Sequence, residues 1–135
     1  MPSCILSVER FLPPHRYPQD VVTGWVQAWL TENGGAEAKR LLGVYSSAGV
    51  EARASVVPIE DVFFPGDFET QNDRYAQIAR EAGVDLARRA LASAGIDRGA
   101  IELVVSVSCT GFMIPALDAY VADALGLGPR LVRLP

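Results

Sequence analysis

The sequence predicts an α/β fold in which helices pack in layers on a mostly parallel sheet. Short apolar runs at residues 5–8, 101–107 and 131–134 are typical of buried strands. Longer segments with helical spacing separate them, and glycine or proline marks most of the boundaries. Half of the residues are hydrophobic and 21% are charged, as in a globular domain. The order strand, helices, strand, helix, strand favours an α/β arrangement.

The first half of the chain predicts two helices and a long loop. Apolar residues recur at helical spacing from Val21 to Leu30, and we expect Trp25 and Trp29 of this stripe in the core. The glycine-containing residues 33–35 end this helix, and residues 36–47 form the second. Residues 50–69 show no clear period, which predicts a loop. Loops this long in compact domains tend to be functional or ordered by a partner.

The second half predicts one long helix and two buried strands. Thr70 is expected to cap a helix over residues 70–94, which Gly95 ends. The strand at 101–107 is apolar at consecutive positions, so we expect cover on both its faces. Pro115 opens a helix that runs to about Leu125. Because a buried strand normally leads into a helix in such folds, we expect the sequence to be cut at Pro135 rather than complete.

Composition narrows the function classes. A net charge of −4, a pI near 4.9 and no run of basic residues argue against nucleic-acid binding. The apolar runs are far shorter than the roughly 20 residues that span a bilayer, and residues 1–9 lack the pattern of a signal peptide. Cys4 and Cys109 lie far apart and have no metal-ligand spacing, so we expect free thiols. We therefore expect a cytoplasmic protein that has no metal and binds no membrane.

The residues alone offer one candidate for chemistry. In open α/β sheets ligands bind beyond the carboxyl ends of strands, where residues 108–111 lie. Cys109 is there either an active-site thiol or a small buried apolar residue. A thiol nucleophile needs a base, but His15, the one histidine, lies in a predicted surface turn. The residues by themselves therefore give no complete catalytic set.

Two segments, residues 67–75 and 105–115, resemble bacterial type III polyketide synthases, which are relatives of chalcone synthase. Residues 13–17 and 125–127 are also similar, so the resemblance covers essentially the whole chain. It implies that residues 1–135 are the N-terminal portion of a chalcone/stilbene synthase-type domain with the thiolase-like αβαβα fold. It also implies a homodimer without metal or organic cofactor, whose substrates are acyl-CoA and malonyl-CoA.

The resemblance further implies an acyltransferase that makes polyketides by decarboxylative condensation with a Cys-His-Asn triad. The nucleophile motif would lie beyond Pro135, so no catalytic residue is expected in this chain. Cys109 and Thr110 are implied to line the substrate cavity, and Ile114 to reach across the dimer interface. Coenzyme A would be held by basic residues, for which the candidates are Lys39, Arg40 and Arg53.

Three hypotheses follow. The chain is part of a condensing acyltransferase, or it is a non-catalytic dimerisation or partner-binding module derived from half a thiolase fold. The third hypothesis is a thiol-dependent enzyme centred on Cys109. An apolar strand at the end of the chain would leave an unpaired edge, so we expect the isolated chain to be poorly soluble or to need a partner.

Overall fold

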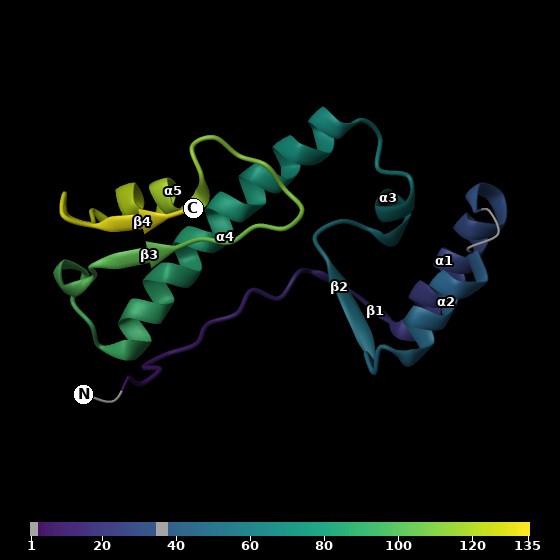
Figure 1. Cartoon of the computed structure of the whole chain (residues 1–135), viewed down its shortest axis with the longest axis horizontal. Helices are drawn as coiled ribbons and strands as arrows, with labels where there is room; N and C mark the ends of the chain where they lie inside the picture. The colour runs from purple at the N-terminus through teal and green to yellow at the C-terminus, as the bar shows by residue number, and fades with distance from the viewer. Residues whose placement is uncertain (1–2, 35–37) are drawn as a thin grey trace. The chain divides into compact units, whose positions relative to one another are not determined.

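The computed structural model describes residues 3–34 and 38–135, without the side chains at positions 38, 39, 41 and 46. The chain divides into two compact units (Figure 1). One unit is Leu12–Gly66, called here the 12–66 unit. The other, the 67–135 unit, joins Asp67–Pro135 with the N-terminal segment up to Phe11.

The 12–66 unit packs two helices beside a small antiparallel sheet. Its elements are β1 (His15–Pro18), α1 (Gln19–Asn33), α2 (Ala38–Ser47), β2 (Ala52–Ser55) and α3 (Ile59–Phe63). β1 pairs with β2 so that His15 lies opposite Ser55. The apolar stripe of α1 supplies the core, in which Val22, Val26 and Leu30 are buried together with Ile59. The predicted helix at the start of the chain is thereby confirmed.

The predicted loop at residues 50–69 is wrong in part, because it contains β2 and α3. Both elements are too short for periodicity to reveal, and both depend on contacts with distant residues. β2 exists because it pairs with β1, and the Ile59 amide at the start of α3 donates to the Tyr17 hydroxyl at 3.0 Å. Trp25 stacks on Phe63 at 5.7 Å between ring centroids and packs on the core as predicted. Trp29 is 40% exposed, so its assignment to the core is wrong.

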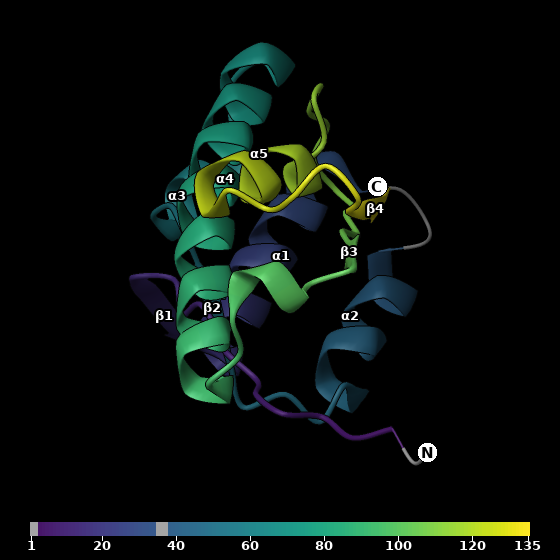
Figure 2. The same cartoon turned by 90° about the vertical axis from the view of Figure 1, so that its left-hand side faces the viewer.

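The 67–135 unit is organised around one long helix. Its elements are α4 (Phe68–Ala94), η1 (Arg98–Ala100), β3 (Leu103–Val105), α5 (Leu117–Leu125) and β4 (Val132–Leu134). α5 lies beside α4 in both views (Figures 1 and 2). A Cβ atom at Gly83 of α4 would lie 2.9 Å from Leu117 Cδ1, so glycine permits this close approach. β3 and β4 pair in parallel, as the sequence predicts, although β3 is shorter than expected.

The boundaries of the helices depend on local capping groups. Asp67, not Thr70, caps α4: its Oδ1 accepts from the Thr70 amide at 2.7 Å. The predicted stop at Gly95 is confirmed, and Gly126 ends α5 in the same way; their φ values are 64° and 60°. α5 begins at Leu117, two residues after the proline expected to open it.

Two predictions fail for the same reason: the strand at residues 5–8 and the cover on both faces of the strand at 101–107. Residues 5–8 form no strand in the structure, and Ile5 is 84% exposed. The β3–β4 sheet also leaves one apolar face uncovered, which consists of Leu103, Val105, Val132 and Leu134, each about half exposed. The sequence pattern records that these residues are apolar, whereas burial requires a second layer against them. The described residues supply no such layer.

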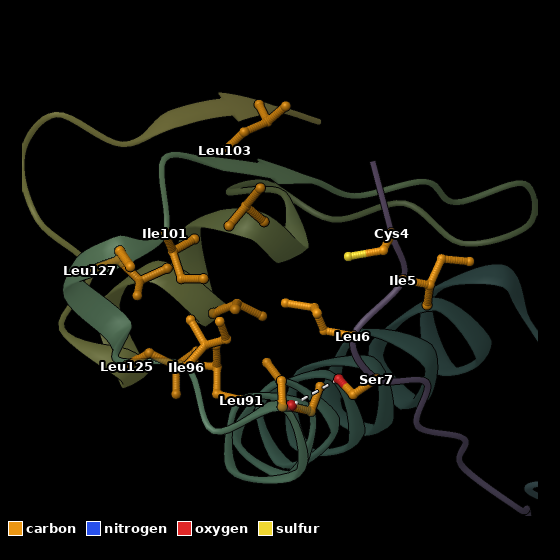
Figure 3. A pocket seen from close by; sticks show the side chains of 16 residues that line it. Cys4, Ile5, Leu6, Ser7, Leu91, Ile96, Ile101, Leu103, Leu125 and Leu127 are labelled. Carbon is orange, nitrogen blue, oxygen red and sulfur yellow. Dashed lines mark hydrogen bonds between the residues drawn. The ribbon is translucent and has the colours of Figure 1, made fainter. Parts of the chain in front are cut away.

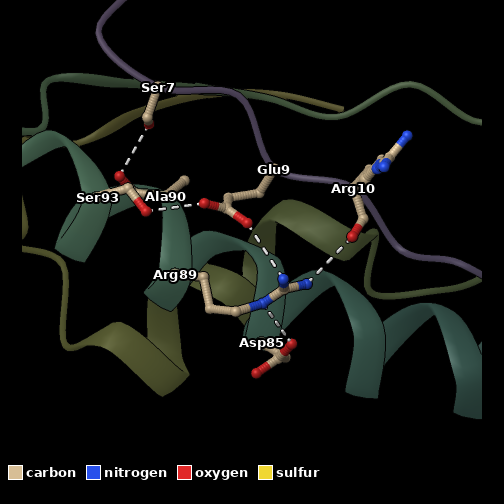
Figure 4. Close-up of polar contacts among 7 residues, drawn as sticks. All are labelled: Ser7, Glu9, Arg10, Asp85, Arg89, Ala90 and Ser93. Carbon is tan, nitrogen blue, oxygen red and sulfur yellow. Dashed lines mark hydrogen bonds and ion pairs between the residues drawn. The ribbon is translucent and has the colours of Figure 1, made fainter.

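A polar cluster fixes the N-terminal segment to α4 (Figure 4). The Arg89 guanidinium pairs with Glu9 at 3.1 Å and with Asp85 at 2.9 Å, and it donates to the Arg10 carbonyl oxygen. The Ser93 hydroxyl donates to the other Glu9 carboxylate oxygen at 2.8 Å. The segment is therefore held by side-chain contacts instead of strand pairing.

A buried carboxylate joins β3, β4 and α5. Asp118 of α5 is 2% exposed, and its Oδ1 accepts from the Ser106 hydroxyl at 3.2 Å. Its Oδ2 pairs with Arg133 of β4 at 3.3 Å. Because both carboxylate oxygens are engaged, the charge is compensated where water is excluded.

The Asp67 cap predicts a pH dependence of stability. Hydrogen bonding by the Thr70 amide lowers the pKa of Asp67 below the ordinary value of 3.8. Its contribution is therefore complete above the unfolded-state pKa and is lost as the pH falls through the lower folded-state pKa. Asp67→Asn keeps a capping oxygen without a charge, so the thermal midpoints of wild type and variant should converge as the pH falls below the ordinary pKa of 3.8. Circular dichroism melts test this, and identical pH slopes would contradict it.

The Asp118 cluster predicts a loss of stability on truncation. Asp118→Ala leaves the Ser106 hydroxyl and the Arg133 guanidinium without their acceptor, which should lower the free energy of unfolding by about 1–3 kcal/mol. Asp123→Ala, an exposed aspartate on the same helix, is the matched control and should change it by less than about 0.5 kcal/mol. Urea denaturation measures both. Equal effects of the two variants would show that the buried contacts contribute nothing specific.

Candidate functional site

The segment between β3 and α5 carries the residues that the sequence singles out. We call residues 106–114 the β3 exit loop; Figure 1 shows it as the long green connection that leaves β3. The Ser108 hydroxyl donates to the Gly111 carbonyl oxygen at 3.0 Å and so closes a turn. Cys109 and Thr110 lie within this turn, and both are exposed. A thiol and a hydroxyl therefore stand side by side at the tip of the loop.

The first turns of α4 hold the β3 exit loop from one side. The Tyr75 hydroxyl donates to the Ser108 hydroxyl oxygen at 2.7 Å. Asn72, three residues earlier on the same helix, accepts from the Phe112 amide at 3.0 Å through its side-chain oxygen. A Cβ atom at Gly111 would overlap the Tyr75 ring, so only glycine allows the backbone to lie on that ring.

A small cavity of about 200 Å³ lies beside the loop. Its polar lining comes from Tyr75, Ser106 and Ser108. The rest of the lining is supplied by Val107, Gly111, Phe112, Met113, Ala116, Leu117 and Pro135. The residues that hold the loop in place therefore also shape this cavity.

The structure places Cys109, Thr110 and Ile114 on one loop, but none of them lines the small cavity. Ile114 is 81% exposed and precedes Pro115 through a cis peptide bond. Because Cys109 is exposed in this chain, the alternative of a small buried residue is wrong here. The sequence assigned no individual role to Asn72, Tyr75 or Ser108, although Ser108 lies in the segment 108–111 that it singled out. Their roles depend on contacts between residues 33 and 40 positions apart.

The candidates for coenzyme A binding lie in the 12–66 unit. Arg53 donates through Nε to the Gln19 side-chain oxygen at 3.0 Å, and its guanidinium lies 5.3 Å from the centroid of the Tyr45 ring. Arg40 is exposed on α2. The side chain of Lys39 lies outside the described residues. His15 lies in β1 instead of the predicted turn, where it is half-buried and stacks on Tyr17.

A larger, apolar cavity of about 660 Å³ lies elsewhere in the 67–135 unit (Figure 3). Its walls come from the N-terminal segment, α4, α5 and β3, and they include Cys4, Leu6 and Leu103. The Ser7 hydroxyl donates to the Ala90 carbonyl oxygen at its edge. Its lining residues are almost all apolar and include no carboxylate, histidine or basic side chain, so the cavity offers no groups for acid–base catalysis.

The described residues contain neither a metal-binding cluster nor a membrane-spanning helix. No group of three or more histidine, cysteine, aspartate or glutamate side chains among them is placed to hold a metal ion. None of the helices in residues 3–34 and 38–135 combines the length and apolar character of a transmembrane span.

Comparison with known proteins identifies relatives over nearly the whole chain. No family model matches. The chain is 34% identical over 131 residues to a 1,3,6,8-tetrahydroxynaphthalene synthase of Streptomyces peucetius subsp. caesius, which covers 97% of this chain and 34% of the relative. It is 32% identical over 130 residues to a phloroglucinol synthase of Pseudomonas fluorescens, covering 92% of this chain and 36% of that protein.

Solved structures agree with these relatives. The crystal structure of the tetrahydroxynaphthalene synthase of Streptomyces coelicolor, a bacterial type III polyketide synthase, matches 93% of this chain with a TM-score of 0.79 and 27% identity. A fungal type III polyketide synthase shares the fold, with a TM-score of 0.65 over 91% of this chain. The predicted fold class, a portion of the thiolase-like α/β fold, is confirmed by these matches.

The chain spans about a third of the length of the curated relatives that it matches, 34% and 36% of the two named above. It covers 35% of the Streptomyces coelicolor structure. Over this length the chain is similar, in sequence and in fold, to type III polyketide synthases.

Proposed function

We propose that the chain forms part of an acyltransferase that condenses malonyl-CoA-derived units onto a CoA-linked starter to make a polyketide. One observation supports this most directly. The match with the tetrahydroxynaphthalene synthase of Streptomyces peucetius includes 97% of the chain, and therefore most or all of the β3 exit loop. We propose that this chain corresponds to the N-terminal portion of the relatives, as the resemblance of residues 67–75 and 105–115 implies.

In this proposal the β3 exit loop borders the cavity in which the polyketide grows. Cys109 and Thr110 present a thiol and a hydroxyl at its tip, which suits contact with the carbonyl oxygens of a poly-keto intermediate. Ile114 carries an exposed apolar side chain from the same loop. Its burial against a second subunit would remove that surface from water, which supports its predicted place at a homodimer interface.

The condensing nucleophile is proposed to lie outside residues 1–135. The sequence holds two cysteines and one histidine. No hydrogen bond joins Cys109 to any described side chain, so the structure offers it no base. We therefore assign no catalytic residue within this chain, and we rank a thiol-dependent enzyme centred on Cys109 last.

Coenzyme A binding by Lys39, Arg40 and Arg53 stays a prediction. Two features of Arg53 support it: the guanidinium is exposed, and its position is fixed by Gln19 and by the Tyr45 ring. A fixed, planar guanidinium is suited to a phosphate group.

A non-catalytic dimerisation or partner-binding module is the second candidate. The uncovered apolar face of the β3–β4 sheet favours it, because such a face is normally buried against another layer. The two functions differ in whether the protein turns over malonyl-CoA.

The first test is an assay of the protein purified from the organism that makes it. With malonyl-CoA and a set of acyl-CoA starters, we expect release of CO₂ and coenzyme A together with a polyketide product. The intact mass of the same sample reports which sequence accompanies residues 1–135. A native protein that turns over no malonyl-CoA but remains bound to a partner would contradict the acyltransferase and support the binding module.

The second test concerns Cys109. In the native protein, Cys109→Ser should change the product mixture by several-fold while the rate of acyl loading stays within about twofold, because a cavity residue contacts intermediates and not the attacking atom. Cys4→Ser is the matched control, since Cys4 is also an exposed free thiol of the 67–135 unit. Complete loss of loading in Cys109→Ser would contradict the assigned role.

A further inference from the structure

We propose that Tyr75 is a positioning residue that determines product specificity by fixing the β3 exit loop through Ser108 and Gly111. The effect on products rests on the proposed function, whereas the positioning of the loop by Tyr75 does not depend on it. The relatives' names and the sequence patterns assign no role to Tyr75.

The first argument is an ordered chain of hydrogen bonds. The Tyr75 hydroxyl donates a hydrogen bond to the Ser108 hydroxyl oxygen, and the Ser108 hydroxyl in turn donates to the Gly111 carbonyl oxygen. Each bond therefore orients the next, and the turn that carries Cys109 and Thr110 is closed at both ends. Without the Tyr75 hydroxyl, the Ser108 hydroxyl would lose the hydrogen bond that fixes its orientation.

The second argument is steric. The Gly111 backbone lies directly on the Tyr75 ring, where a Cβ atom has no room. The position of the ring and the path of the loop are therefore fixed by each other. Asn72 adds a second anchor by accepting from the Phe112 amide, so α4 holds the loop on both sides of its tip.

The third argument is that loop position and cavity shape share the same residues. Tyr75, Ser108, Gly111 and Phe112 all line the cavity of about 200 Å³. Movement of the loop would alter both the volume beside α4 and the direction in which Cys109 is presented. A growing polyketide intermediate that folds against this loop would then contact different side chains. The first acyl transfer would be unaffected.

Hydrogen exchange of the native protein tests the positioning without any assay of activity. In Tyr75→Phe, the Phe112 amide, which donates to Asn72, should exchange roughly five- to tenfold faster, because loss of the Tyr75 hydrogen bond lets the loop open more often. Tyr120→Phe is the matched control, because its ring packs under Arg80 at 5.2 Å through a contact that phenylalanine retains. Unchanged exchange of the loop in Tyr75→Phe would overturn the proposal.

Product analysis tests the specificity. Tyr75→Phe and Ser108→Ala should shift the product ratio in the same direction, by about fivefold, and the double variant should shift it no further. Ser108→Thr keeps the hydroxyl and should restore the wild-type ratio, a rescue that a merely structural role would not give. Additive shifts, or no rescue by threonine, would overturn the specificity role.

The two proposals fail in different ways. A native protein that turns over no malonyl-CoA contradicts the proposed function, whereas faster exchange of the loop in Tyr75→Phe would still support the positioning role. Conversely, normal turnover with unchanged exchange and unchanged products in Tyr75→Phe leaves the proposed function standing and overturns this inference.

Discussion

The packing of α5 against α4 is the contact on which the 67–135 unit depends. Gly83 lets Leu117 approach the helix backbone, and the 27 residues of α4 extend far enough to contact the N-terminal segment, α5 and the β3 exit loop. Arg89 near its end holds the N-terminal segment, and Tyr75 near its start holds the β3 exit loop. Asp67 caps the first turn of α4 and so stabilises the end of the helix that lies near this loop.

Different residues of the site supply its chemical groups and hold its loop in place. Cys109 and Thr110 supply a thiol and a hydroxyl at the tip of a loop, but neither side chain forms a hydrogen bond with another residue in the described part of the chain. Fixation comes from Tyr75 and Asn72 on α4, and from the Asp118 cluster at the base of the loop. Helices are more rigid than loops, so a loop held at several points by a helix can present its side chains reproducibly.

The sequence was informative wherever the cause was local. The apolar stripe of α1 and the glycine after α4 were predicted because helical spacing and left-handed caps act within one or two turns. The cap of α4 was misplaced by three residues, since Asp67 and Thr70 are both acceptable capping residues. β2, α3 and the absence of a strand at residues 5–8 were not predicted, because pairing with distant segments decides them.

By itself, the sequence determined the α/β class, the long helix α4, the parallel pairing of the last strand and, through residues 67–75 and 105–115, the resemblance to a polyketide synthase. Only the tertiary structure decided that Tyr75 holds the β3 exit loop through Ser108, and that Cys109 is exposed. The physical reason is range. Periodicity and capping are properties of neighbouring residues, whereas a hydrogen bond between residues 75 and 108 exists only after α4 and β3 have packed.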